Sequence, residues 1–539
     1  MRVGLWAAAA VFPAIFLAGV GESALGATGT FNRQGSPQPA GKLVTFAGAS
    51  NMFILTDGTV MVQVQRTGQW QRLCPDINGS YLLGTWSADD PKCPAIAAIP
   101  AGFNYQPTFY ASAVLPDGRV GLMGGEFNAA GTQPANQGAL YDPKVNKWVP
   151  LRFPFGWTVV GDSQSVILPS GQWMIADCCN EQKKQALFLP GNLTWTPTGA
   201  YYASNNDEAG WTLLPDGSVL TVDIDNGFAA NSNSERWVNG IWNPAAFPSA
   251  STQQELIDCT TNVGTTAMPN YIQCPNAGVA RNNEDGPNIL LADGTVLGVG
   301  AAAGNVSIYT PGTNTWATTD RLPAACGAGN NQQCMAADAP AVLLPNGNAL
   351  LFAGPIYNSN GSHFFEFNPG AATGAKWQQV PAATEPPNAA NEPTWRGHML
   401  VLPTGQIMFT DESNDVQIYS PIGAPNSAWV PTVSTFPAAI TRGMTYNIYG
   451  KLFNGMSQAN AYGDENLAAT NYPLVRVTNV ATKHVFYART HDHSAMGVAM
   501  TSTTVFTRFE LPLGAETGAS QLEVIANGIP SAKVNVTIN

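Results

Sequence analysis

The chain has few charged residues: Lys, Arg, Asp and Glu make up 11% of its 539 residues. The 36 acidic residues outnumber the 24 basic ones, which gives a net charge of −12. A surface of this sign repels polyanions, so the composition argues against nucleic acid or an anionic membrane as partner. The composition is compatible with small-molecule or glycan ligands, with cations and with basic partners.

The common catalytic motifs are also missing. The sequence has no Gly-rich phosphate loop, no HExxH zinc motif and no Gly-x-Ser-x-Gly motif in a strand–turn–helix setting. The cysteines lack the paired C-x₂₋₄-C spacing of zinc sites, and no histidine lies near them. The sequence motifs therefore indicate none of the reactions that these motifs catalyse.

Long apolar runs are absent beyond the first part of the chain. Arg2 precedes an apolar run over residues 3–20, and the small residues around Ala24 and Gly26 follow where a signal peptidase would cut. We predict a signal peptide over residues 1–27, with an uncleaved membrane anchor as the alternative. The mature protein is then expected to be secreted, periplasmic or on the cell surface, without a membrane span.

Eight cysteines are typical of an oxidising compartment. They fall into sequence-local pairs, and local pairing is the simplest prediction, although other connectivities stay open. The pairs are Cys74 with Cys93, Cys178 with Cys179, Cys259 with Cys274, and Cys326 with Cys334.

The chain is rich in turn residues, with 54 glycines and 40 prolines. The stretch from Leu115 to Val120 is an apolar residue, a Pro-Asp-Gly turn and a second apolar run, which predicts a β-hairpin. Seven such hairpins recur, as expected of a radial repeat. Their turn glycines are Gly58, Gly118, Gly171, Gly217, Gly294, Gly347 and Gly405.

A tryptophan follows each hairpin, and we interpret it as the residue that opens the fourth strand and packs between neighbouring blades. The set is Trp70, Trp148, Trp195, Trp242, Trp316, Trp377 and Trp429. The pattern predicts an all-β fold with a seven-bladed propeller over roughly residues 40–432. Alternating strands over residues 436–539 predict a C-terminal immunoglobulin-like β-sandwich.

Insertions are predicted between the fourth strand of one blade and the first strand of the next, at residues 71–104, 243–280 and 320–337. Propeller geometry places these loops, and those between strands two and three, on one decorated face opposite the Pro-Asp-Gly hairpins. Cys178 and Cys179 follow a second strand and belong to that face. They form either a vicinal disulfide that presents an apolar edge to a ligand or two free thiols.

Two phrases indicate a known family. Gly124-Gly125 together with the Tyr141–Trp148 phrase resembles the kelch repeat, and the segments 453–458, 462–464 and 470–478 resemble the last domain of the galactose oxidase and glyoxal oxidase family. The resemblance implies a copper ion at the decorated face. Its ligands there are two tyrosines, one of them cross-linked to a cysteine, and two histidines.

The family's copper ligands lie nine or ten residues before the turn glycine of their blades. The matching positions here are Ala49, Phe109, Trp395 and Arg396, none of which is a tyrosine, cysteine or histidine. The comparison therefore predicts that copper-radical chemistry is not retained. The alternative is an oxidase with shifted ligands: Tyr110, His398 and His493.

The same register places acids at four consecutive blades: Asp162, Glu208, Asp285 and Asp338. Carboxylates that converge on a channel repel one another. Protonation, Arg396 or a hard cation such as Ca²⁺ would relieve the repulsion. The alternative is that each acid caps backbone N–H groups of its own blade.

The segment Thr490–Ser494 adds His491 and His493 at the tip of a predicted hairpin. In the family it resembles, a hairpin of the last domain enters the propeller channel and delivers a histidine. If this one did so, the two histidines would complete a mixed nitrogen and oxygen metal site with the acids. The alternative is a solvated polar tip.

We therefore expect a non-oxidase that binds a carbohydrate or cell-surface component at the decorated face. The predicted ligand contacts are Phe109, Trp395, Arg396, Cys178 and Cys179. A copper-radical oxidase acting on an alcohol, aldehyde or sugar is one alternative, and a structural or adhesive surface protein is another.

Overall fold

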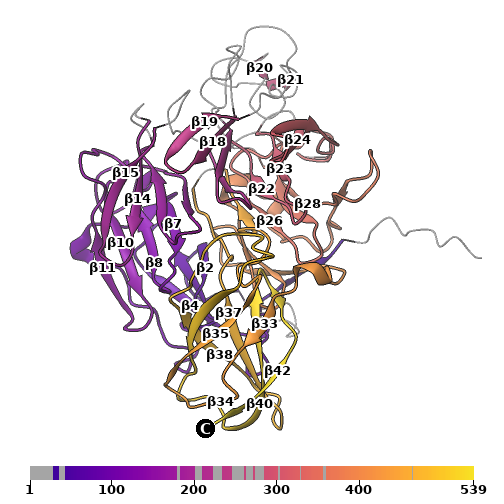
Figure 1. Cartoon of the computed structure of the whole chain (residues 1–539). Coiled ribbons are helices and arrows are strands. Elements are labelled where there is room, and N and C mark those ends of the chain that lie inside the picture. The colour runs from indigo at the N-terminus through magenta and orange to yellow at the C-terminus, as the bar shows by residue number, and fades with distance from the viewer. Residues whose placement is uncertain are drawn as a thin grey trace, which may run out of the picture.

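The structure is a computed structural model that describes residues 28–34, 43–178, 183–200, 209–222, 234–245, 260–262, 271–273, 285–301, 304–327, 329–355, 360–463 and 465–539. It is an all-β protein with a seven-bladed β-propeller and a C-terminal domain of sandwich-like sheets (Figure 1). The predicted signal peptide, Glu208, Cys179, Cys259 and Cys274 lie outside the described residues.

The seven hairpins are confirmed, with one geometry throughout. In the second blade Gly118 N donates to Leu115 O at 2.9 Å, and Leu115 N donates to Arg119 O at 2.8 Å. The turn glycines all have positive φ, between 78° for Gly58 and 95° for Gly347, a conformation that side chains disfavour. Asp117 Oδ1 accepts from Arg119 N at 3.1 Å, which closes the turn.

Blades two to six each contain four strands in chain order. Blade two is β7 (Ala111–Val114), β8 (Val120–Met123), β10 (Gly138–Asp142) and β11 (Lys147–Leu151). Blade three is β12 (Ser165–Ile167), β13 (Trp173–Ala176), β14 (Gln185–Leu189) and β15 (Thr194–Thr198). Blade four is β16 (Trp211–Leu213), β17 (Val219–Val222), β18 (Ser234–Val238) and β19 (Ile241–Pro244). Blade five is β22 (Asn288–Leu290), β23 (Val296–Val299), β24 (Val306–Thr310) and β25 (Thr315–Thr318). Blade six is β26 (Ala341–Leu343), β27 (Ala349–Ala353), β28 (His363–Phe367) and β29 (Trp377–Gln379).

Blade one departs from the prediction. Its strands are β2 (Ala49–Ile54), β3 (Val60–Val64), β4 (Trp70–Cys74) and β5 (Thr85–Trp86). Trp70 therefore opens the third strand, and Trp86 occupies the fourth. The connection 75–84 joins strands three and four, so only the later part of the predicted 71–104 insertion links this blade to the next.

Blade seven is closed by the start of the chain. β30 (His398–Val401), β31 (Ile407–Thr410) and β32 (Gln417–Ser420) are completed by β1 (Thr30–Arg33), which pairs antiparallel with β32. The propeller thus begins before residue 40. Trp429, predicted in a fourth strand, lies instead in the 3₁₀ turn η4 (Ser427–Trp429), because β1 already fills that place.

The fourth-strand tryptophans tie neighbouring blades together, as predicted. Each indole N–H donates to the preceding blade or to the connection that leaves it, for example Trp242 to Gln185 Oε1 at 3.1 Å and Trp195 to Arg152 O at 2.6 Å. Trp86 donates to Gln34 Oε1 at 3.0 Å, just after β1. Because of these bonds, the large indole rings fill the space between blades without leaving their N–H donors unsatisfied.

The C-terminal domain consists of β33 (Thr432–Thr435), β34 (Ala439–Ile440), β35 (Thr445–Lys451), β37 (Leu474–Asn479), β38 (Val485–His491), β39 (Val505–Glu510), β40 (Gly518–Ala526), β41 (Ile529–Pro530) and β42 (Val534–Ile538). β38 pairs with β37 through its first half and with β39 through its second, so it belongs to both layers. Side chains such as Ile448, Val475 and Phe509 fill the space between them. In Figure 1 the C terminus lies at the end of this domain away from the blades.

Residues 457–463 and 465–472, which we call the channel segment, leave this domain and enter the propeller. β36 (Asn460–Ala461) pairs antiparallel with β26, the innermost strand of blade six. Gln458 Oε1 accepts from Leu213 N of blade four at 3.0 Å, and Asn460 Nδ2 donates to Met399 O of blade seven at 2.8 Å. Asn466 bonds Asn51 of blade one at 3.1 Å. One segment thus fastens several blades to the C-terminal domain.

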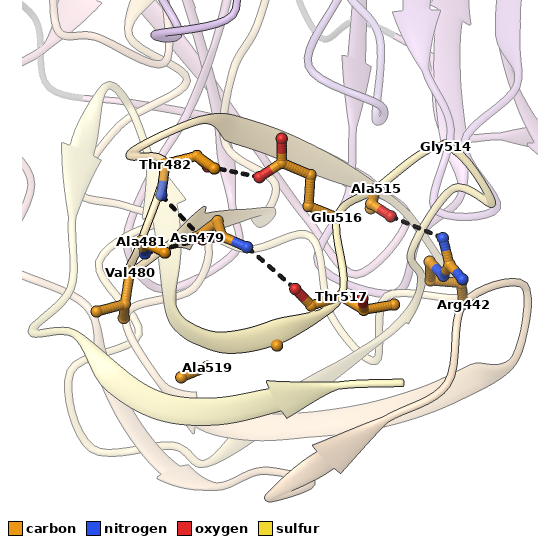
Figure 2. Close-up of a pocket in the computed structure, with 11 residues that line it drawn as sticks. Arg442, Asn479, Val480, Ala481, Thr482, Gly514, Ala515, Glu516, Thr517 and Ala519 are labelled. Carbon is orange, nitrogen blue, oxygen red and sulfur yellow. Dashed lines mark hydrogen bonds between the residues drawn. The ribbon is translucent and has the colours of Figure 1, made fainter.

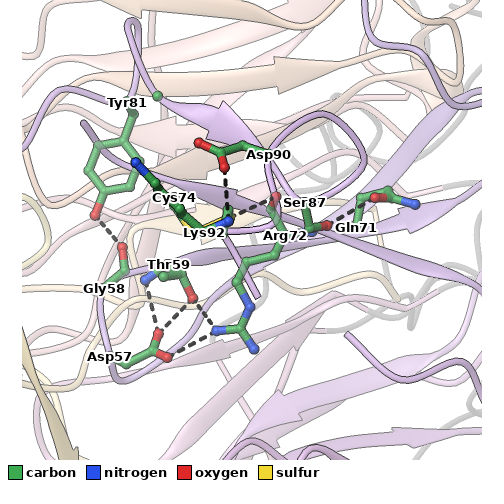
Figure 3. The surroundings of a disulfide bond; sticks show 12 residues. Asp57, Gly58, Thr59, Gln71, Arg72, Cys74, Tyr81, Ser87, Asp90 and Lys92 are labelled. Carbon is green, nitrogen blue, oxygen red and sulfur yellow. Dashed lines mark hydrogen bonds and ion pairs between the residues drawn. A yellow bond between two sulfur atoms is a disulfide. The ribbon is translucent and has the colours of Figure 1, made fainter. Parts of the chain in front are cut away.

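Two disulfides have both cysteines among the described residues, Cys74–Cys93 and Cys326–Cys334, and both pairings were predicted. The first staples the connection that carries the fourth strand of blade one. Figure 3 shows Arg72, two residues before Cys74, pointing to Asp57 and Thr59, with bonds of 3.0 and 2.8 Å. The second lies between blades five and six, as expected.

The two disulfides fit an extracellular protein. In the described residues no helix has the length and apolar character needed to cross a membrane. The remaining short elements are η1 (Ala101–Phe103), η2 (Ala389–Asn391), η3 (Thr394–Arg396), the pair β6 (Pro107–Thr108) and β9 (Phe127–Asn128), and the pair β20 (Thr260–Asn262) and β21 (Tyr271–Gln273).

Candidate functional site at the channel mouth

Three aromatic rings meet where the innermost strands of blades two and seven begin. The ring centroids of Phe109 and Trp395 are 5.8 Å apart, edge to face, and those of Phe109 and Phe127 are 6.2 Å apart. Phe127, on the β6–β9 flap, is 41% exposed, and the other two rings are partly exposed. We call Phe109, Phe127, Trp395 and Arg396 the mouth cluster.

Arg396 sets the charge of the cluster. Its guanidinium carbon lies 5.0 Å from the centroid of the Trp395 ring, a cation–π contact. Nη1 donates to Glu392 Oε2 at 2.6 Å, and Nε lies 3.8 Å from Glu412 Oε2. Among the described residues, Nη2 donates no hydrogen bond, and the side chain is 39% exposed. A polar ligand group above Trp395 could accept from it.

Strained backbone marks the same region. Phe109 has φ of 52°, Asp338 44° and Glu412 62°, values that non-glycine residues seldom adopt. Each comes from a different blade. Outliers of this kind gather at sites where the surrounding structure holds a particular geometry.

Two buried acids lie behind the cluster, in the loop between β31 and β32. Burial raises the pKa of Asp411 to about 6, helped by the nearby charges of Glu392 and Asp415 and opposed by the bonds from Ser413. Burial also raises the pKa of Glu412, although Arg396 counteracts it. Glu412 N donates to Ala49 O at 2.9 Å, so this loop also joins blade seven to blade one.

The channel segment reaches the mouth through Tyr462. Its hydroxyl donates to the backbone carbonyl of Trp395, and its ring stacks on His398 with centroids 5.7 Å apart. Gly463 lies against Asp338. A residue of the C-terminal domain therefore supports the part of the backbone that carries Trp395 and Arg396.

The residues at the mouth do not fit the copper centre that the family resemblance implies. Phe109, Trp395 and Arg396 are brought together here, and Ala49 lies behind Glu412, yet none offers a copper-binding side chain. The segment that enters the channel brings Tyr462 and contains no histidine.

The shifted ligands are no better placed. The hydroxyl of Tyr110 donates to Gln63 Oε1 at 2.7 Å, and burial raises its pKa strongly. His398 is buried beside Ser50, and burial lowers its pKa to about 3. His493 lies at the hairpin face, where its backbone N–H donates to Pro116 O at 3.1 Å. The inner strand β2 separates the two faces by roughly 17 Å.

The predicted acidic ring is brought together only in part. Asp338 N donates to Asp285 O at 3.1 Å, so these two adjoin. Asp285 accepts from Gly286 N of its own blade at 2.8 Å, as the capping alternative has it, and also from Asn288 Nδ2 at 2.9 Å and from Gly210 N of blade four at 3.3 Å. In the described part of the chain, no group of three or more His, Cys, Asp or Glu residues is suited to a metal ion.

Cys178 is buried next to another of these acids. Its sulfur lies 2.7 Å from Asp162 Oδ1, and it is disulfide-bonded. Neither residue is exposed enough to present an edge at the surface. A role of the Cys178–Cys179 pair in ligand contact stays a prediction.

Sequence reasoning did not single out Phe127, Glu392, Glu412 or Tyr462. The register counted back from the turn glycine finds only residues that lead into innermost strands. Phe127 and Glu412 lie in loops after second strands, and Tyr462 arrives from another domain. For Tyr462, the one sequence indication was that it belongs to segment 462–464, which resembles the last domain of the galactose oxidase and glyoxal oxidase family.

A separate hollow lies in the C-terminal domain, lined by Arg442, residues 479–482 and residues 514–519, with a volume of about 650 Å³ (Figure 2). Its polar side chains serve their own turns. Asn479 Nδ2 donates to Thr517 O at 3.2 Å, Glu516 bonds Thr482 and His484, and Arg442 donates to Ala515 O at 3.0 Å. We assign it no ligand.

No protein-family model matches the sequence, and no curated protein does. Solved structures that resemble it include a fungal alcohol oxidase of the AA5 family in complex with copper, at 13% identity and TM-score 0.46, over 96% of this chain and 100% of that one. A streptogramin B lyase follows at 11% and 0.43, over 73% and 98%. Hydrazine synthase of Kuenenia stuttgartiensis gives 12% and 0.39, over 72% and 99%. With TM-scores below 0.5, none of these likenesses bears on substrate or cofactor.

Proposed function

We propose that the protein is an exported binding protein that is not an oxidase, and that it holds a carbohydrate or cell-surface component at the mouth cluster. The observation that carries the proposal is the combination of three partly exposed aromatic rings with an arginine that has unused N–H donors. Ring faces pack against the C–H groups of a sugar, and guanidinium donors bond its hydroxyls.

The electrostatics favour a neutral ligand over an anionic one. Glu392 and Glu412 offset the charge of Arg396, and the whole chain carries −12. An acidic sugar would gain one ion pair and meet two nearby carboxylates. We therefore place neutral oligosaccharides first.

The test is a glycan array followed by calorimetric titration of any neutral oligosaccharide that binds. The Trp395→Ala protein should lose at least tenfold in affinity, because it loses the ring face. Phe155→Ala is the matched control, since Phe155 is a fully exposed aromatic in the loop between blades two and three. Equal affinity in the Trp395→Ala and wild-type proteins contradicts the proposal. An array on which no glycan binds the protein supports a structural or adhesive protein instead.

A further inference from the structure

His491, the last residue of β38, and His493, in the turn that follows, each have an imidazole with an unused ring nitrogen. His491 Nε2 and His493 Nε2 are both buried, and neither has a hydrogen-bond partner among the residues that the structure describes. His493 is 7% exposed and the side chain of His491 is 13% exposed. Buried polar atoms nearly always have partners, so two such nitrogens on nearby residues point to a ligand.

The other ring nitrogens fix the tautomers. His491 Nδ1 lies 2.9 Å from Asp492 Oδ2, and a carboxylate only accepts, so this nitrogen carries the proton. His493 Nδ1 lies 2.8 Å from Thr507 Oγ1. That hydroxyl is 3.2 Å from His491 O and 3.0 Å from Arg508 O, so a carbonyl takes its proton and His493 Nδ1 donates. Both Nε2 atoms are then unprotonated, and each carries a lone pair that can bind a ligand.

This is the arrangement of histidines that ligate metals. A ligating imidazole usually donates its second N–H to a carboxylate or another acceptor, which fixes the ring and its tautomer. Ring orientation is held further by Tyr472, which stacks on His493 with centroids 6.2 Å apart at 12°.

We propose that His491 and His493 bind one divalent transition-metal ion, of which Zn²⁺ is the test case, through their Nε2 atoms at the hairpin face of the propeller. Imidazole is a preferred ligand of such ions. Thr56 Oγ1 of blade one is another buried atom without a partner among the described residues, and Thr56 O accepts from Thr490 N at 3.0 Å. The ion would sit where the C-terminal domain meets blade one.

The site is separate from the mouth cluster and does not depend on the proposed function. Asp492 is also bonded by Arg508 Nη1 at 3.0 Å, so its carboxylate is held in position to orient His491. An ion at this junction would stabilise the contact between the domains, because binding to the folded state alone raises its stability.

The experiment titrates ZnCl₂ into EDTA-treated, dialysed full-length protein, with calorimetry and thermal unfolding as readouts. Wild-type protein should bind one equivalent and unfold at a higher temperature with Zn²⁺. His491→Gln should abolish both effects, and Asp492→Asn should weaken binding by roughly 10- to 100-fold. His484→Gln is the control, because His484 Nδ1 bonds Glu516 in a different turn.

His493→Gln tests the second proposed ligand. Because His493 is buried, this variant can fail to fold, and binding by Asp492→Asn then tests the site. Asp492 has a side chain 45% exposed, so its substitution leaves the core intact. Wild-type protein that takes up no Zn²⁺ overturns the proposal. So does unchanged affinity in His491→Gln, or a loss of binding in His484→Gln.

Discussion

The hydroxyl of Tyr462 donates a hydrogen bond to the backbone carbonyl of Trp395. Because Tyr462 belongs to the channel segment, the C-terminal domain holds the rim of the propeller channel in place. Tyr462→Phe removes the hydroxyl and keeps the ring on His398, so it should lower the free energy of unfolding by about 1 kcal/mol. Urea unfolding measures it, with Tyr446→Phe as control, because the Tyr446 hydroxyl accepts only a solvent-exposed bond from Thr441 N, at 2.9 Å, within the C-terminal domain. Equal losses of unfolding free energy in the two variants would show that the Tyr462–Trp395 bond contributes no more to stability than an exposed hydrogen bond.

Closure of the ring depends on β1, and Phe31 is its anchor. Phe31 is 5% exposed and packs against Phe364 and Tyr419, with ring centroids 4.5 and 4.8 Å away. Phe31→Ala should therefore cost about 3–5 kcal/mol in urea unfolding. Phe155→Ala should stay within about 0.5 kcal/mol, because its ring is fully exposed. A small loss at Phe31 would mean that the blade closes without this strand.

The sequence was sufficient for features that local chemistry determines. Each hairpin depends on a Pro-Asp-Gly or related turn whose bonds span only a few residues, so seven blades could be counted. The family-like phrase also marked the segment around Tyr462, although it did not show that this segment enters the channel.

Features that depend on distant pairing could not be predicted in this way. Trp70 looks like the other fourth-strand tryptophans, and only the pairing of Cys74 with Thr85 shows that another strand follows it. The pairing of Thr30 with Ser420 joins the two ends of the ring, which no local pattern encodes. The mouth cluster likewise combines loops of different blades.

The two described disulfides should differ in their contribution to stability. Cys74–Cys93 closes a separation of 19 residues and Cys326–Cys334 one of 8. Loop entropy predicts losses of about 3 and about 2.5 kcal/mol on replacing each pair by alanine. Scanning calorimetry of the two double variants measures the difference. A larger loss at the shorter loop would show that contacts around the bond, and not loop entropy, dominate.

Asp411 should make the protein more stable in mild acid. Its pKa in the fold is about 6, above the ordinary 3.8, so between these values the folded state holds the proton more tightly. Stability from this group is complete below about pH 4 and is lost as the pH rises through 6, by roughly 3 kcal/mol. Asp411→Asn cannot ionise, so it should exceed wild type at pH 7.5 and approach it at pH 4.5.

Asp415→Asn is the matched control for that prediction, because it lies in the same loop but carries an ion pair. Asp415 bonds Arg33 Nε at 2.6 Å and Nη2 at 2.9 Å, which ties the loop to β1. Its removal should lower stability at pH 7.5, opposite in sign to Asp411→Asn. Guanidinium unfolding of the three proteins at both pH values separates the effects. If Asp411→Asn is less stable than wild type at pH 7.5, the carboxylate is held charged by its Ser413 bonds and burial does not dominate.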